Sequence, residues 1–387
     1  MSTAVKMKIP SDISTLSTRH AMMNAQPSPP RRLTLIFLLA SALFSGCSLK
    51  YVVPLDGLYD SQMPAVTTES RRAFDRLLSS TVRVTWTPEY RTTHYAHDLD
   101  RNGQPVSDPS SPTGFRLVGG EGGISQSRDA YSIVGTGLLL SRRATGMSLD
   151  GGVILTAAHV VSAPDTVRAY LWDSRGRPTG ALASISVKVS GFVFVTGQGG
   201  GSAGATVRRV DKGQDLALLT VSIPTGVTTM AGFGYRIGNG AELDWGNFVY
   251  LIGYPHGQAQ MTWGIVSRGE PGGAFTVDAT VNFGYSGGPV LAVRDGLPNL
   301  ELVGICRGAS VNKFRYLAPN DLVATGARMT SRMIEDTLVK EMQQVEYGTA
   351  FIVPVEVIRP FVLSAREIFA EKGIDVLNDP SLRNWGF

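Results

Sequence analysis

Short runs in which apolar and polar residues alternate dominate the chain from residue 81 onward. This period of two is typical of strands with one buried face, and it predicts a body built mostly of β-structure. The clearest predicted strands are Thr81–Trp86, Ser132–Ser141, Gly151–Val161, Val167–Asp173, Ala181–Ser190, Phe192–Thr196, Ala205–Val210, Asp215–Val221, Phe248–Pro255, Ala259–Arg268, Ala274–Asn282, Gly288–Arg294, Leu300–Gly308 and Gly348–Ile358.

Five segments depart from the strand pattern. Apolar residues at helical spacing predict short helices at Thr68–Ser79 and Pro360–Lys372. The same spacing in Thr330–Tyr347 predicts a helix packed on the body, with contact to a partner or a membrane as the alternative. Tyr90–Ala130 is poor in apolar residues and is interpreted as a long surface loop. Gly197–Gly204 is glycine-rich like a phosphate-binding loop, but no Lys-Ser/Thr follows it, which favours a hairpin loop.

The first 46 residues are typical of an export signal. Arg31 and Arg32 precede Leu33–Ser45, a run without charge that is too short to span a bilayer as a helix. The sequence Ser-Gly-Cys that follows resembles the lipobox of bacterial lipoproteins, in which the cysteine is lipidated after cleavage. We therefore expect residues 1–46 to be removed, Cys47 to carry lipid, and 47–67 to form a tether.

Composition and charge narrow the classes of protein. The 387 residues are 43% hydrophobic, which is ample for a large core, and the net charge is +4. Residues 1–46 hold five basic residues and one acidic residue, so the remaining chain is neutral. This balance argues against nucleic acid as a partner.

The chain has two cysteines. If Cys47 carries lipid, Cys306 is a lone thiol, expected to be a small buried side chain. If Cys47 is not lipidated, a disulfide between the two is the alternative in an oxidising compartment.

The candidate chemistry centres on Phe275–Val290. It begins as an alternating strand and breaks into Gly-Tyr-Ser-Gly-Gly-Pro, with Ser286 in the middle. Glycines allow a turn that exposes a serine hydroxyl and points backbone N–H groups at one spot. Acyl transfer needs this combination, a nucleophile beside donors for the oxyanion that it creates.

A base and an orienting carboxylate are also present. His159 follows an apolar strand through small residues, and Asp215 opens another apolar strand, where a carboxylate needs a hydrogen-bond donor. The order His159, Asp215, Ser286 is one of the chain orders known for this triad. The remaining histidines lie in the leader, in polar loops or in a turn, and they suggest no metal site: His20, His94, His97 and His256. The sequence contains no cofactor motif.

The segments TAAHVV, DLALL, YLIGYPHGQAQMTWGIVS, VDATVNFGYSGGPV, LVGICRG and GTAFIVPVEVI together resemble trypsin-like serine proteases of the bacterial Deg/HtrA type. The resemblance covers roughly Thr81–Val362. It implies an all-β fold of two six-stranded antiparallel barrels with a few peripheral helices, and a substrate cleft between the barrels. The expected protease domain is 68–359, with barrels at about 79–222 and 235–359 and a helical tail at 360–387.

The resemblance also implies the site. His159, Asp215 and Ser286 would be catalytic, and the N–H groups of Gly284 and Ser286 would form the oxyanion hole. The expected substrate pocket has Thr280 at its base and Arg307 and Gly308 along its wall. Since no acidic residue lies at that base, small or medium apolar side chains are expected to fit.

The chain departs from the family in three features. Tyr285 stands where the family usually has asparagine or aspartate. The segments 90–130 and 312–347 are long insertions. About 25 residues follow the last predicted strand, too few for the PDZ domain that Deg/HtrA proteins carry.

The sequence therefore predicts a serine endopeptidase that acts on polypeptides of the bacterial envelope. A lipid at Cys47 would hold it in the membrane, facing the periplasm, and the expected location is the outer membrane. The alternative is a catalytically inactive protease-like barrel that serves as a binding or scaffold lipoprotein, because Tyr285 could hold the oxyanion loop in an unproductive shape.

Overall fold

The computed structural model describes residues 55–64, 67–143, 148–173, 177–267, 275–319 and 337–387, with side chains described outside 310–347. Within these ranges no helix is both long and apolar enough to cross a membrane. The leader and Cys47 lie outside the described residues.

Six antiparallel strands form a closed first barrel. The order is β1-β3-β4-β8-β7-β6, and β6 pairs back to β1. Their bounds are β1 Thr81–Tyr95, β3 Ile133–Arg143, β4 Leu149–Ala157, β6 Pro178–Thr196, β7 Ser202–Asp211 and β8 Leu216–Pro224. Val82, Val84 and Trp86 of β1 point into a buried core, as their alternation with polar residues predicts.

The second barrel has the order β13-β10-β11-β12-β15-β14 and closes through the pairing of β13 with β14. Its bounds are β10 Phe248–Gly253, β11 Gln260–Ser267, β12 Phe275–Asp278, β13 Pro289–Val293, β14 Leu300–Pro319 and β15 Thr337–Pro354, and β9 Arg236–Ile237 adds to β14 in parallel. The predicted all-β double barrel is confirmed.

A core shared by the two barrels positions the cleft. Leu138 and Leu155 of the first barrel belong to the same buried cluster as Tyr250 and Leu291 of the second. Burying these apolar side chains together holds the barrels against each other, so that loops from both meet at one site.

Helices cover this shared core. The predicted helix Thr68–Ser79 is α2, which begins with a capping box at Thr67 and buries Ala73 and Leu77. The expected closing helix at 360–372 is instead two helices, α4 (Val355–Leu363) and α5 (Arg366–Glu371). Short 3-10 turns complete the chain: η1 Gly120–Gly123, η2 Ala158–Val160, η3 Gly240–Glu242, η4 Pro255–Gly257 and η5 Arg383–Trp385.

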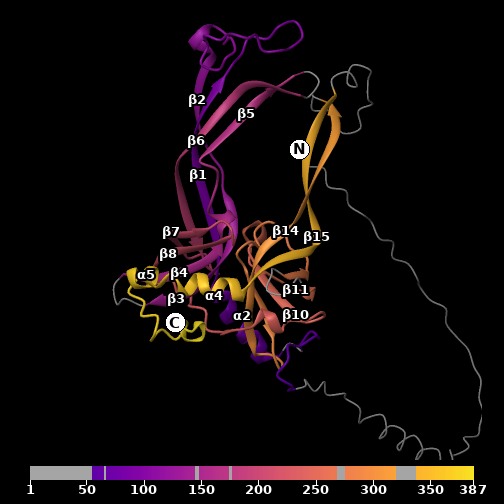
Figure 1. Cartoon of the computed structure of the whole chain (residues 1–387). Coiled ribbons are helices and arrows are strands. Elements are labelled where there is room, and N and C mark those ends of the chain that lie inside the picture. The colour runs from indigo at the N-terminus through magenta and orange to yellow at the C-terminus, as the bar shows by residue number, and fades with distance from the viewer. Residues whose placement is uncertain (1–54, 65–66, 144–147, 174–176, 268–274, 320–336) are drawn as a thin grey trace, which may run out of the picture. The chain divides into compact units, whose positions relative to one another are not determined.

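The interpretation of Tyr90–Ala130 as a loop is wrong at both ends. Strand β1 continues to Tyr95 and pairs with β2 (Ile124–Ala130) on one side and β6 on the other. Strand β5 (Thr166–Trp172) pairs with β6, so four strands, β2-β1-β6-β5, continue beyond the barrel (Figure 1). The sequence pattern did not predict these strands, because few of their side chains enter a core. A strand without a buried face needs no alternation of apolar and polar residues.

The predicted helix at Thr330–Tyr347 is also wrong where it can be compared. Residues 337–347 belong to β15, and its pairing with the end of β14 runs from Pro319↔Thr337 to Ser310↔Glu346. Ladder hydrogen bonds to a strand distant in sequence satisfy the backbone in place of helical bonds and override the local spacing. Residues 320–336 lie outside the described residues.

Candidate active site

His159 lies in the short turn η2 that follows β4, and Asp215 immediately precedes β8, the neighbour of β4. His159 Nδ1 is 2.9 Å from Asp215 Oδ2 and 3.1 Å from Oδ1. The backbone N–H of His159 donates to Asp215 Oδ1 at 3.0 Å. These contacts fix the imidazole and leave Nε2 as the ring nitrogen directed away from the carboxylate.

Asp215 has a positive φ of 57°, a conformation that costs energy for a residue with a side chain. Its carbonyl accepts from Ala158 N–H at 3.1 Å, which helps to hold it. Burial raises the pKa of Asp215, but the hydrogen bonds and charge of His159, together with the charge of Arg307, outweigh burial and bring the pKa below its ordinary value. The carboxylate therefore stays ionised at neutral pH.

Ser286 lies in a tight loop between β12 and β13. Gly287 N–H donates to Cys306 O at 2.7 Å, and Thr136 N–H of the first barrel donates to Ser286 O at 2.8 Å. Gly287 has φ +83°, and a Cβ there would lie 2.2 Å from Thr136 O, so the loop requires glycine. The loop is thus pinned to strands of both barrels.

Two backbone donors in the loop remain unused. In the described part of the chain, neither Gly284 N–H nor Ser286 N–H donates to a protein acceptor. Gly284 has φ +108°, and its carbonyl accepts from the Thr136 hydroxyl at 2.6 Å. With its carbonyl side bonded to Thr136, the loop keeps the two N–H groups available to a ligand.

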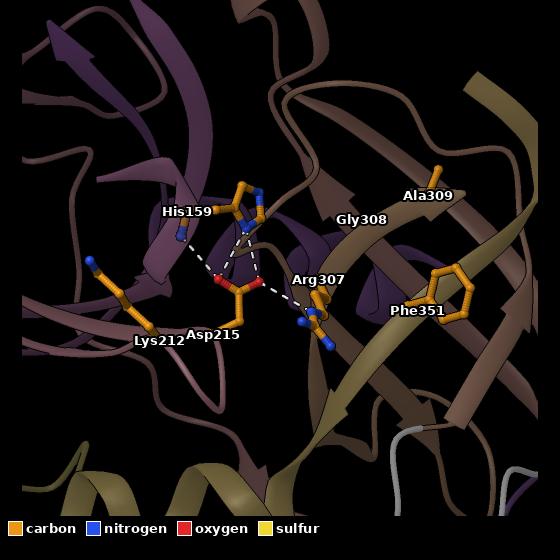
Figure 2. Close-up of a pocket in the computed structure, with 7 residues that line it drawn as sticks. All are labelled: His159, Lys212, Asp215, Arg307, Gly308, Ala309 and Phe351. Carbon is orange, nitrogen blue, oxygen red and sulfur yellow. Dashed lines mark hydrogen bonds and ion pairs between the residues drawn. The ribbon is translucent and has the colours of Figure 1, made fainter. Parts of the chain in front are cut away.

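The Ser286 hydroxyl lies near Gly308, one of the residues that line the pocket containing His159. This pocket is lined by His159, Lys212, Asp215, Arg307, Gly308, Ala309 and Phe351 (Figure 2). A Cβ on Gly308 would lie 3.9 Å from Ser286 Oγ, at ordinary van der Waals distance. Among the described residues, no hydrogen bond joins Ser286 Oγ to His159. Such bonds are often long in the absence of substrate.

Only two of the three predicted pocket residues line this pocket. Arg307 and Gly308 line the pocket, whereas Thr280 is exposed and is not among its lining residues. Arg307 Nε lies 3.4 Å from Asp215 Oδ2, so Figure 2 shows Asp215 bonded to His159 on one side and Arg307 on the other. Sequence reasoning missed this ion pair, since nothing in LVGICRG indicates that its arginine turns toward the carboxylate.

Thr136 was also missed. Besides bonding Gly284 O, its hydroxyl accepts from Tyr254 N–H at 3.0 Å. The residue lies in an ordinary strand run, and only the contact between barrels reveals its connection to the serine loop.

Tyr285 is 4% exposed and packs in the core of the second barrel, its own. The ring belongs to this buried cluster and not to the core of the neighbouring barrel. The backbone of Gly253 approaches so closely that a Cβ there would lie 2.6 Å from the Tyr285 ring. Burial raises the pKa of Tyr285 to about 12, so the phenol stays neutral.

The other described histidines lie apart from this pocket. His94 contacts Ser127 in the four-strand extension, and His97 contacts the Leu182 carbonyl. His256 lies in η4 and lines a second pocket. In the described ranges, no three His, Cys, Asp or Glu side chains gather as a metal site would require.

Comparison with known proteins places the site in context. Residues 135–305 match the family described as the trypsin-like peptidase domain, and this range includes His159, Asp215 and Ser286. Serine protease HTRA1A of Danio rerio is 29% identical over 45% of this chain and 31% of its own length. Serine protease HTRA3 of Mus musculus is 28% identical over 50% of this chain and 38% of its own length.

The chain therefore spans about a third of the length of these curated relatives. Two solved structures of the HtrA-type protease AlgW with a decapeptide are 18% identical, with TM-scores of 0.41 and 0.39. They cover 80% and 76% of this chain, and 68% and 65% of their own chains. The family match thus gives the chain a segment similar to a trypsin-like peptidase domain, and the curated relatives that it resembles are HtrA serine proteases.

Proposed function

We propose that the protein is a serine endopeptidase whose triad is His159, Asp215 and Ser286. The observation that carries the proposal is the His159–Asp215 pair, 2.9 Å apart, in a pocket whose lining residue Gly308 lies beside Ser286 Oγ. A base oriented by a carboxylate beside a serine is the arrangement that activates a hydroxyl for attack on a carbonyl.

In the proposed reaction, His159 Nε2 takes the Ser286 proton as Oγ attacks the peptide carbonyl. It then returns this proton to the leaving amine, and a water molecule repeats the sequence to release the acyl group. Asp215 holds the His159 ring in the tautomer with the proton on Nδ1 and stabilises the imidazolium that forms. Arg307 contacts the same carboxylate and helps to keep it in place.

The N–H groups of Gly284 and Ser286 would stabilise the oxyanion. Each is free of a protein acceptor among the described residues. Removing one such donor costs about 3–4 kcal/mol of transition-state stabilisation in other proteases. Tyr285 supports this role because its buried ring anchors the loop between the two donors.

The test is Ser286→Ala, assayed on unfolded polypeptide and with a fluorophosphonate probe. We expect cleavage and labelling to disappear while the unfolding temperature is unchanged, because a half-exposed hydroxyl adds little to the core. His159→Ala should behave alike, whereas His94→Ala, on the extension, should keep wild-type activity.

Equal cleavage by Ser286→Ala and wild type would overturn the proposal. If neither protein labels nor cleaves, the inactive scaffold is the correct function.

We further propose that the mature protein is a lipoprotein of the bacterial envelope and acts on proteins there. The support is the sequence alone: Arg31 and Arg32, the uncharged run Leu33–Ser45 and Cys47. Mass spectrometry of membrane extracts should find an acylated peptide that begins at Cys47, and Cys47→Ala should release a soluble form. An unmodified N-terminus elsewhere would refute the anchor.

A further inference from the structure

The pocket beside His159 carries more positive than negative charge. Lys212 and Arg307 line it, and Asp215 is its one acidic lining residue. Both Asp215 oxygens already contact His159, and Arg307 lies 3.4 Å from one of them. The pocket is therefore left with a cation that its own residues do not neutralise.

Lys212 is the cation without a partner. The side chain is exposed, and no carboxylate in the described ranges lies within ion-pair distance of its amine. Asp165, whose pKa Lys212 helps to lower, is paired with Lys188 at 2.6 Å. In Figure 2 the Lys212 side chain lies on the other side of Asp215 from Arg307.

A second pocket adjoins the serine loop. It is lined by Arg83, Thr85, Ser132, Val134, His256, Gly257 and Phe283, with no carboxylate among them. Phe283 directly precedes Gly284, and Val134 lies two residues before Thr136, which bonds Ser286 O. The two pockets share no lining residue; one lies beside His159 and the other beside Gly284.

Arg83 is the cation of this second pocket. Its guanidinium donates to Gly257 O at 3.1 Å and Thr196 Oγ1 at 3.4 Å, both neutral acceptors. Its Nε is buried and has no partner among the described residues. A buried guanidinium edge without a carboxylate has lost water without gaining an ion pair.

Resting on the proposed function, we propose that the cleft selects acidic polypeptide segments, with Asp or Glu on each side of the scissile bond. A carboxylate in the pocket beside His159 binds Lys212, with Arg307 adding attraction. A carboxylate on the opposite side binds Arg83. Charged hydrogen bonds of this kind are stronger than neutral ones and give specificity as well as affinity.

Cleavage of a proteome-derived peptide library, read by mass spectrometry, tests the proposal without assuming a sequence. We expect Asp and Glu to be enriched on both sides of the cleaved bond. Matched peptides with Glu or Gln at the enriched positions should then differ roughly tenfold in kcat/KM at low salt, as one charge-assisted hydrogen bond implies. The difference should shrink at high salt, since ions screen exposed charges.

Variants of Lys212 and Arg83 show which cation recognises the acidic residue on each side of the cleaved bond. Lys212→Gln should abolish the Glu preference on one side only, and Lys212→Glu should convert it to a preference for Lys. Arg83→Gln should abolish the preference on the other side, whereas Arg83→Lys, which keeps the charge, should retain it. Arg128→Gln on β2 makes the same charge change on an exposed residue outside both pockets and should change nothing.

A binding measurement separates this proposal from the proposed function. Ser286→Ala should bind a fluorescent Glu-containing peptide roughly tenfold more tightly than its Gln counterpart. Cleavage with equal use of Glu and Gln, or a preference that survives in both Lys212→Gln and Arg83→Gln, overturns the acidic preference alone. A Glu preference in binding without cleavage by wild type keeps the preference and overturns the enzyme.

Discussion

At the scale of single residues, burial decides which reactive groups take part in chemistry. Asp215 is buried yet ionised, because His159 and Arg307 surround its carboxylate with donors and positive charge. Cys306, one residue before Arg307, is fully buried in the second barrel, where burial raises its pKa to about 12. Two adjacent positions in the chain thus hold a thiol excluded from solvent and a cation that lies 3.4 Å from the Asp215 carboxylate.

We predict that Cys306 is unreactive in the folded protein. In a Cys47→Ala chain, iodoacetamide at pH 8 should label native protein negligibly and unfolded protein completely. The folded pKa lies above the ordinary 9.0, so burial favours the neutral thiol. The stability this contributes is complete below pH 9.0 and is lost as the pH rises toward about 12. Rapid stoichiometric labelling of native protein at pH 8 would contradict the burial.

At the scale of elements, strand β3 supports the serine loop across the interface between barrels. Thr136 contributes both its N–H, to Ser286 O, and its hydroxyl, to Gly284 O. The carbonyl of Thr136 in turn accepts from Thr156 of β4 at 2.6 Å. One strand of the first barrel therefore connects the loop that carries Ser286 to the strand that leads to His159.

We predict that Thr136→Val lowers kcat more than it changes KM. The isosteric change removes the 2.6 Å bond to Gly284 O and the acceptor for Tyr254 N–H, so the oxyanion loop loses its fixed position. The free energy of unfolding should fall by about 1–3 kcal/mol, the cost of leaving buried polar groups unpaired. Kinetics and thermal unfolding measure both effects.

The matched control is Thr92→Val, another buried threonine, which bonds Ser186 in the extension. It should lose stability but keep kcat. An unchanged kcat in Thr136→Val would show that the loop is held by its other bonds.

At the scale of the whole molecule, the segment before α2 is fastened to the second barrel. Arg294 lies 4.0 Å above the Tyr59 ring, and the Tyr59 hydroxyl donates to the buried carboxylate of Glu301 at 2.8 Å. Asp60 N–H donates to Val293 O at 2.8 Å. The segment is therefore part of the folded body, and none of these contacts involves the serine loop.

We predict that activity requires no cleavage between Tyr51 and Thr81. In digestive trypsin relatives a freed N-terminal amine pairs with an aspartate before the nucleophile, but Tyr285 has no carboxylate and is anchored by burial. A chain that begins at Val53 with one extra residue should hydrolyse peptide fully. A chain trimmed to Thr68 should gain no activity and should unfold more readily, because it lacks the Tyr59 contacts. Hydrolysis by the trimmed chain alone would establish a zymogen.

The candidate site was predictable in part. Glycine-rich turn chemistry and apolar flanks are local properties, and they pointed to His159, Asp215 and Ser286. The structure brings the first two together at 2.9 Å and places the third beside Gly308, which lines their pocket. The surroundings of Arg307, Lys212, Arg83 and Thr136 come from segments distant in the sequence, so no local pattern could assign them.

By itself, the sequence determined that the body is β-structured and where most barrel strands lie, because a buried face imposes its period of two on each strand separately. Only the tertiary structure decided that β1 and β6 continue as a four-strand extension and that residues 337–347 form a strand. In those segments, hydrogen bonds to a distant strand replace burial as the stabilising interaction. The tertiary structure likewise decided that Tyr285 packs in its own barrel, since the space open to a ring depends on the approach of Gly253.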